Sequence, residues 1–155
     1  MRKSPKLSQT SVVRQQSGQD KEKEPIMNYY LEVLKKYAVF SGRARRKEYW
    51  MFVLFNLVII TVLILIDSLM GTFSPQAGLG LLSGLYSLAV LLPSIAVTVR
   101  RLHDTGRSGW WILLGLIPII GGIVLLIFMV LNSEPGANQY GPNPKDVIAS
   151  ASAPA

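Results

Sequence analysis

Residues Trp50–Ile66 read WMFVLFNLVIITVLILI, an apolar stretch without one charged side chain. Two further uncharged apolar runs, Leu79–Val99 and Trp110–Leu131, follow it in the chain. At a helical rise of about 1.5 Å per residue, each run can cross or nearly cross a hydrocarbon core about 30 Å thick. The sequence therefore predicts an all-α membrane protein with three transmembrane helices, over about residues 49–66, 79–99 and 110–131.

The composition also favours a membrane protein. Half of the 155 residues are hydrophobic and only 16% are charged, so too few residues remain to cover three apolar runs in a soluble fold. The net charge of +7 does not indicate nucleic-acid binding, because the aromatic residues lie at the ends of the runs, as in membrane-interface anchoring. The sequence contains no cysteine, which excludes thiol catalysis and thiolate metal sites within it.

The chain divides into a membrane domain and two polar tails. Residues 1–26 are rich in Ser, Gln and Lys and lack apolar periodicity, which predicts a disordered N-terminal tail. Residues 27–146 form the predicted membrane domain. Residues 147–155 are of low complexity and are predicted to be a second disordered tail.

A short amphipathic segment precedes the first run. Tyr30, Leu34, Tyr37 and Ala38 recur at helical spacing and form one apolar stripe. This pattern predicts a short helix that lies in the membrane interface. The alternative is a helical extension that packs on the membrane spans.

The positive charges predict the topology. Six Lys or Arg residues lie between Leu34 and Glu48, none lies in the loop after the first run, three lie in Arg100–Arg107, and the tail has only Lys145. Under the positive-inside rule, this alternation predicts a cytoplasmic N-terminus and a C-terminus on the opposite side. An alternative remains, in which Pro118 and Gly121–Gly122 bend the third run into a re-entrant hairpin and return the tail to the cytoplasm.

Two charged connectors separate the runs: FSGRARRKEYW at Phe40–Trp50 and RRLHDTGRSGWW at Arg100–Trp111. The basic residues of the first either only fix the orientation or also hold lipid phosphates. In the second, Asp104 can pair with Arg100 one turn away or with the first connector, and a structural Arg–Asp contact between the connectors is expected. The candidate polar cluster consists of Arg43, Arg45, Arg46, Glu48, Arg100, Arg101, His103, Asp104 and Arg107.

No metal, cofactor or catalytic site is expected. His103 is the only histidine of the sequence, and a His-Asp pair resembles a metal-dependent hydrolase only when further ligands accompany it. Glu48 and Asp104 would add too few ligands for a strong site.

Small residues on the second and third runs predict close helix packing, within one chain or between copies. Asn56 is expected to join helices, and Asp67 to be a solvated carboxylate at the outer interface. Asp67 has no basic neighbour on its own side of the membrane, whereas Asp104 is expected to pair with an arginine. Asp104→Asn is expected to reduce stability by about 1–3 kcal/mol more than Asp67→Asn. The candidate packing residues are Gly80, Gly84, Ser87, Gly115 and Gly122.

The segment from Met27 to about Asp146 resembles the bacterial inner-membrane family catalogued as domain-of-unknown-function family 805. The two connector motifs and GANQYGPNP at Gly136–Pro144 carry the resemblance. It implies a small multi-span protein of the bacterial inner membrane without an established activity.

The residues favour a non-enzymatic function. The leading interpretation is a scaffold embedded in the lipid bilayer that binds a partner protein or anionic phospholipid headgroups. The alternative is an oligomeric channel or transporter of small solutes, assembled from copies of the chain through the small-residue faces. No run carries a charged side chain at mid-depth, which counts against an ion-coupled carrier.

Overall fold

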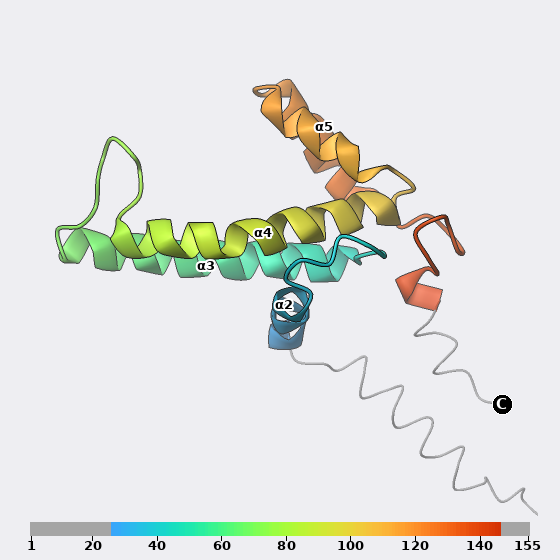
Figure 1. Ribbon diagram of the computed structural model, residues 1–155, viewed down its shortest axis with the longest axis horizontal. Helices are drawn as coiled ribbons and strands as arrows, with labels where there is room; N and C mark the ends of the chain where they lie inside the picture. Colours follow the sequence, from blue (N-terminus) through green and yellow to red (C-terminus); the bar gives the residue numbers. More distant parts are fainter. Residues whose placement is uncertain (1–25, 147–155) are drawn as a thin grey trace, which may run out of the picture.

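The computed structural model describes residues 26–146, and the predicted tails at 1–26 and 147–155 lie outside this range except for Ile26. Within it the chain is helical (Figure 1), and its β-structure is limited to two isolated bridges. The elements are α2 (Ile26–Lys35), α3 (Arg46–Leu69), α4 (Leu81–Asp104), the 3-10 helix η1 (Gly109–Leu116) and α5 (Ile120–Val130).

Helices α3 and α4 form a side-by-side pair that runs the length of the molecule (Figure 1). Each has 24 residues, about 36 Å at 1.5 Å per residue, and by length and composition each can cross a membrane. Large apolar side chains cover their outer faces, among them Leu57 and Leu65, which are each 60% exposed. Such a surface requires an apolar surrounding rather than water.

A chain of polar side chains joins the pair internally. The Tyr86 hydroxyl donates to Oδ1 of Asn56 at 2.6 Å, which links α4 to α3. The hydroxyls of Tyr86 and Tyr30 are 3.1 Å apart, which adds α2 to the same chain. The prediction that Asn56 joins helices is therefore confirmed, since its side chain has partners on both.

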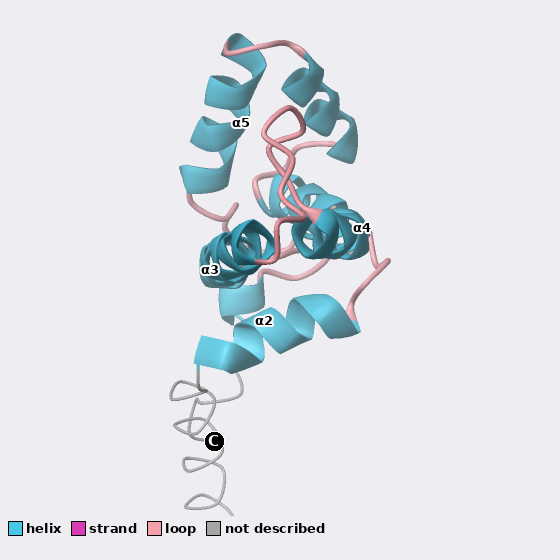
Figure 2. Ribbon diagram, turned by 90° about the vertical axis from the view of Figure 1, so that its left-hand side faces the viewer, coloured by secondary structure: helices cyan, strands magenta, loops and turns pink. Residues whose placement is uncertain are grey.

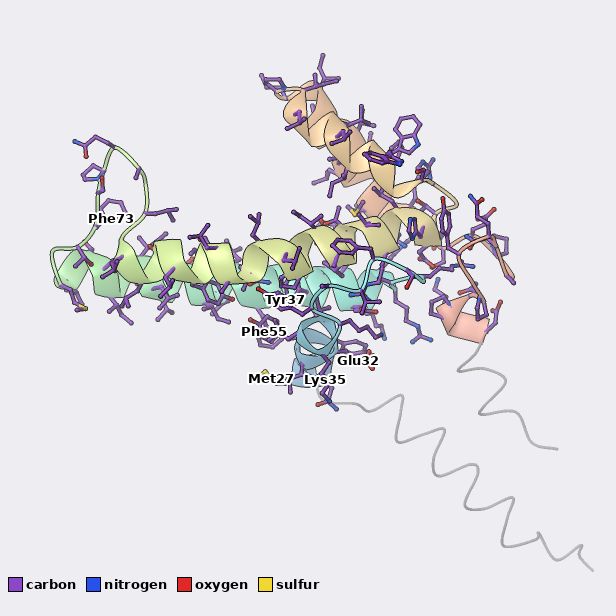
Figure 3. The ribbon with its side chains drawn as sticks, viewed as in Figure 1. Met27, Glu32, Lys35, Tyr37, Phe55 and Phe73 are labelled. Atoms are coloured by element: carbon purple, nitrogen blue, oxygen red, sulfur yellow. The ribbon has the colours of Figure 1, made fainter. Side chains whose placement is uncertain are left out.

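Helix α2 lies crosswise over the α3–α4 pair (Figures 1 and 2). Tyr30 stacks on Phe52 with 5.5 Å between ring centroids, and Val33 is completely buried. Figure 3 shows Glu32 and Lys35 on the side of α2 turned away from the pair. The predicted amphipathic helix is present, but it packs on the spans, which was the alternative, and it ends at Lys35.

The third apolar run is not one helix. It is divided into η1 and α5, which are joined by a turn at residues 117–119 and contact each other. With eight residues in η1 and eleven in α5, each arm is only about 16 Å long. The prediction of a third continuous span is therefore wrong, and a hairpin stands in its place (Figure 2).

Pro118 and Gly121 explain the turn. Proline lacks an N–H and disfavours helical geometry in the preceding residue, and Ile117 is extended with φ −86° and ψ 113°. Ile119 then has a φ of +64°, which is strained for a β-branched residue, and Ile120 N donates to Pro118 O at 2.7 Å. A Cβ on Gly121 would lie 1.6 Å from the Leu114 carbonyl oxygen, so only glycine permits this approach of the two arms.

The hairpin brings the chain back to the end of the helix pair that carries the two connectors. Residues 131–146 lie at the end of the pair where α3 begins and α4 ends (Figure 1). Glu134 N donates to Asp104 O at 2.8 Å, and Arg43 Nη1 donates to Gly136 O at 2.7 Å. The prediction of a C-terminus opposite the connectors is therefore wrong, because the chain turns back at Pro118 and Gly121–Gly122 and contacts the first connector.

Asp67 is not a solvated carboxylate, contrary to expectation. It is completely buried and accepts hydrogen bonds from Leu82 N, Ser83 N, Ser83 Oγ and Thr72 Oγ1 at 2.7–3.0 Å. Its charge thus satisfies the free amides at the start of α4, where a helix favours an anion. A Cβ on Gly80 would lie 2.3 Å from Cγ of Asp67, so this glycine makes room for the carboxylate.

Because the sequence contains no cysteine, single-cysteine variants can test the arrangement in membrane vesicles. We expect Ser41→Cys and Lys145→Cys to react with an impermeant maleimide from the same side, and Gln76→Cys from the other. Leu116→Cys, near the hairpin tip, should react from neither side until detergent is added. Labelling of Lys145→Cys from the Gln76 side would restore the three-span topology.

Adjacent glycines of α5 provide a matched test of the hairpin. Gly121→Ala should lower the free energy of unfolding by about 1–3 kcal/mol, because the new methyl group meets a backbone oxygen. Gly122→Ala should leave stability unchanged or raise it by up to about 1 kcal/mol, since its Cβ would meet nothing within 4 Å. Thermal unfolding in detergent measures both, and equal melting temperatures would contradict the hairpin.

Candidate functional site

The connectors meet the C-terminal segment at one end of the α3–α4 pair. Ala44 N donates to Arg100 O at 3.0 Å, which fixes the first connector against the last turns of α4. Around this contact lie most of the charged residues expected from the sequence. We call Arg43, Arg45, Arg46, Glu48, Arg100, Arg101, His103 and Asp104 the connector cluster.

Asp104 is the centre of the connector cluster. Its side chain is completely buried, and Oδ1 accepts from Arg43 Nε at 3.0 Å. Oδ2 accepts from Arg101 Nη1, three residues earlier on the same helix, and from Ser133 Oγ at 2.6 Å. Asp104 therefore pairs across the connectors as expected, but its local partner is Arg101 rather than Arg100.

Arg43 joins three segments with one guanidinium group. Besides Asp104, it donates from Nη1 to Gly136 O at 2.7 Å and from Nη2 to Glu134 O at 2.6 Å. Its side chain is only 1% exposed. Arg43 is thus a tether for the C-terminal segment and is not available to a lipid phosphate.

Arg100 pairs with Glu48, the third residue of α3. Nη1 lies 2.6 Å from Oε1 of Glu48, and both side chains are buried. Nε and Nη2 of Arg100, and Nε of Arg45, have no hydrogen-bond partner among residues 26–146. Three arginines are buried at this end, Arg43, Arg100 and Arg101. Only two carboxylates of the described residues, Glu48 and Asp104, are buried beside them, so one buried positive charge is in excess.

Two arginines hold the end of α5. Arg101 donates from Nε to Met129 O at 3.2 Å and from Nη2 to Leu131 O. Arg46 Nε donates to the same Leu131 oxygen at 2.7 Å. The last carbonyls of a helix have no partner within it and attract cations, so these contacts fix the hairpin to the connector cluster.

His103 and Arg107 lie at the edge of this assembly. The His103 ring stacks on Tyr140 at 3.7 Å between centroids, and Nδ1 lies 3.3 Å from Gly42 O. Arg107 forms no ion pair with the described part of the chain, and its guanidinium carbon lies 4.1 Å from the centre of the Phe128 ring. Within residues 26–146, no group of three or more His, Asp or Glu side chains is arranged to hold a metal ion.

The predicted packing residues have different environments. Gly80 adjoins Asp67, whereas a Cβ on Gly84 or Gly122 would meet nothing within 4 Å. Ser87 Oγ donates to Ser83 O within its own helix, and a Cβ on Gly115 would lie 3.4 Å from Leu125 Cδ1. The closest glycine approach in the hairpin belongs instead to Gly121, which sequence reasoning left out of the packing set.

Sequence reasoning also missed the C-terminal partners. Asn138 Nδ2 donates to His103 O at 3.0 Å, and Ser133 completes the shell of Asp104. In the sequence this region shows only turn-forming residues. The motif at Gly136–Pro144 was a signal of family resemblance, but its spacing did not indicate which carbonyls would face Arg43.

Comparisons with known proteins place the chain among inner-membrane proteins. A family profile described as "Protein of unknown function (DUF805)" matches residues 37–142. The chain is 50% identical over 119 residues to each of two proteins of Escherichia coli K12, inner membrane proteins YhaH and YhaI. These alignments cover 77% of this chain and 98% and 97% of the relatives.

A more distant relative is the uncharacterized protein YiiR of Escherichia coli K12. It is 31% identical over 137 residues, which covers 70% of this chain and 87% of the relative. No solved structure matches the chain.

Asp104→Asn should lower the free energy of unfolding by about 3 kcal/mol or more, because it leaves two buried arginines without their carboxylate. Asp67→Asn should also be costly, by about 1–3 kcal/mol, since an amide cannot accept from all four donors. Asp67→Asn therefore cannot serve as the control variant. Asp146→Asn, which changes an exposed carboxylate, is the control instead. Chemical unfolding in detergent should rank Asp104→Asn lowest, and equal stability of all three would contradict the cluster.

Proposed function

This chain belongs to the DUF805 family of proteins of unknown function, and we propose that it is a non-enzymatic scaffold of the bacterial inner membrane. In this proposal α3 and α4 span the bilayer, and the η1–α5 hairpin enters it from the connector side without crossing. The surface that binds a partner protein is the C-terminal loop, residues 134–144, held rigidly over the connector cluster. The observation that carries the proposal is the contact of Arg43 with Asp104, Glu134 and Gly136.

The rigidity of this loop supports a recognition role. Arg43 donates to three of its carbonyl oxygens, those of Glu134, Gly136 and Gly141. Asn138 donates to a carbonyl oxygen of α4, and Tyr140 stacks on His103. Exposed residues such as Gln139 therefore stand on a fixed backbone. A preorganised loop loses little conformational entropy on binding, which is an advantage for a docking surface.

The charges support a cytoplasmic position for the connector cluster. The basic residues from Arg43 to Lys47, those from Arg100 to Arg107 and Lys145 all belong to one end of the α3–α4 pair. The loop at the other end, residues 70–80, has no Lys or Arg. Under the positive-inside rule this asymmetry favours a cytoplasmic N-terminus and a cytoplasmic C-terminal loop.

The burial and hydrogen bonding of the charged groups favour a structural role for them over a catalytic one. Asp104, Arg43 and Arg101 are all shielded from solvent and saturated by internal partners. A catalytic acid or base must reach the proton that it transfers, and buried, saturated groups do not. This supports a fixing role for the connector cluster.

A groove between α3 and α4 favours a second candidate, an oligomeric channel for small solutes. It has a volume of about 400 Å³ and includes the polar side chains of Asn56, Tyr86, Ser87, Ser94 and Thr98. Polar side chains between membrane-spanning helices line solute pathways when copies of a chain assemble around them. Flux of small solutes through proteoliposomes of the purified protein would favour this candidate.

A matched pair of glutamines tests the scaffold. A photo-cross-linking amino acid in place of Gln139 should give a discrete adduct with one other membrane or cytoplasmic protein in living cells. The same amino acid at Gln76, exposed on the opposite loop, should give none. Arg43→Lys keeps the charge near Asp104 but loses the forked contact with two carbonyls, so it should reduce the Gln139 adduct several-fold at equal protein level.

The outcomes separate the two candidates. An adduct of the same mass from both glutamines, or one insensitive to Arg43→Lys, would contradict recognition by the C-terminal loop. Cross-links only between copies of the chain, together with solute flux, would replace the scaffold by the channel.

A further inference from the structure

We propose that the groove beneath the hairpin binds one acyl chain of an anionic phospholipid, whose phosphate contacts Arg46 and Lys47. The lipid belongs to the leaflet on the connector side. This inference rests on the proposed membrane arrangement, in which the hairpin lies within that leaflet, but not on the partner-binding role of the C-terminal loop.

The residues that line the groove come from the hairpin and from the helix pair. Figure 2 shows the hairpin standing over that pair. It has a volume of about 420 Å³ and is distinct from the polar groove between α3 and α4, although the two share Tyr49, Ser94 and Thr98. Four of the five described elements, α3, α4, η1 and α5, contribute apolar side chains to its walls. They include Trp50 of α3, Ile95 of α4, Ile112 of η1, and Leu125, Leu126 and Met129 of α5.

The serine and threonine hydroxyls of the groove are not free to bind an occupant. Ser94 Oγ donates to Val90 O at 2.6 Å, and Thr98 Oγ1 donates to Ser94 O at 2.7 Å. Both donors are therefore satisfied within α4, and the surface left to an occupant is largely hydrocarbon. In a membrane the neighbours of such a surface are acyl chains, and a chain that fills it gains the dispersion contacts that a void would lack.

Unpaired positive charge lies at the connector end of the groove. Arg46 and Lys47 precede Trp50, a groove residue, by four and three residues. Both therefore lie about one helical turn from Trp50, on the same face of α3 and toward the connectors. Arg46 donates Nε to Leu131 O, which holds it over the end of α5, and it remains partly exposed. The ion pairs within residues 26–146 involve neither Arg46 nor Lys47.

The nearby carboxylates are already engaged. Glu48 pairs with Arg100, Asp104 pairs with Arg43 and Arg101, and Glu134 accepts from Asn138. The groove thus combines an apolar slot with two cations at the height where lipid phosphates lie. An anionic phospholipid matches both features with one molecule.

Lipid binding can be measured on the purified full chain in neutral detergent by native mass spectrometry. Phosphatidylglycerol should bind at least fivefold more tightly than phosphatidylcholine with the same acyl chains. Glycerol phosphate, which carries the anionic group without acyl chains, should not bind detectably. Arg46→Gln should weaken phosphatidylglycerol about fivefold, the equivalent of ~1 kcal/mol per cation near an anionic surface.

Two glycines with open surroundings test the slot itself. Gly122 lines the groove and Gly84 does not, and a Cβ at either position would meet nothing within 4 Å. Gly122→Leu should fill the slot and weaken phosphatidylglycerol binding about tenfold or more, whereas Gly84→Leu should leave it unchanged. Lys35→Gln, a charge change at an exposed position of α2, is the control for Arg46→Gln. Melting temperatures without added lipid show whether each variant is folded.

Three results would overturn the proposal: equal binding of phosphatidylglycerol and phosphatidylcholine, equal binding by Gly122→Leu and wild type, or full binding of glycerol phosphate. The last result would identify a headgroup site without an acyl slot. Failure of the Gln139 cross-link would leave these titrations unaffected, so loss of the scaffold role and loss of the lipid site are distinguishable.

Discussion

The ion pair between Arg43 and Asp104 is the contact on which the connector end of this protein depends. In a site shielded from water, an unpaired carboxylate or guanidinium is strongly unfavourable, so each group requires the other. Arg43 comes from the first connector, Asp104 from the end of α4, and the remaining donors of Arg43 hold the C-terminal loop. One buried charge therefore fixes the relative positions of three segments that lie far apart in the sequence.

Another buried carboxylate, Asp67, lies at the opposite end of the helix pair. Asp67, near the end of α3, accepts from the first amides of α4 and closes the turn between the two helices. The two carboxylates have different donors. Two arginines and the Ser133 hydroxyl donate to Asp104, whereas only backbone amides and hydroxyls donate to Asp67. Between them, the pair presents mostly apolar side chains outward, as a surrounding of lipid requires.

The hairpin shows how local geometry overrides apolar length. Trp110–Leu131 is long enough to span a bilayer, yet Pro118 interrupts its hydrogen bonds and Gly121 lets the two arms approach. Arg46 and Arg101 then bind the carbonyls at the end of α5 and hold it near the connectors. A span would place those carbonyls on the far side of the membrane, beyond the reach of both arginines.

The sequence by itself determined the all-helical membrane class, the positions of α3 and α4, the family and a contact between the connectors, because apolar length and charge asymmetry are local properties. Only the tertiary structure decided that the third run turns back, that Asp67 is buried, and that Asp104 pairs with Arg43 and Arg101. These outcomes depend on which donors meet in space. Residues such as Ser133 and Gly136 carry no charge or periodicity that would reveal their partners before the chain has folded.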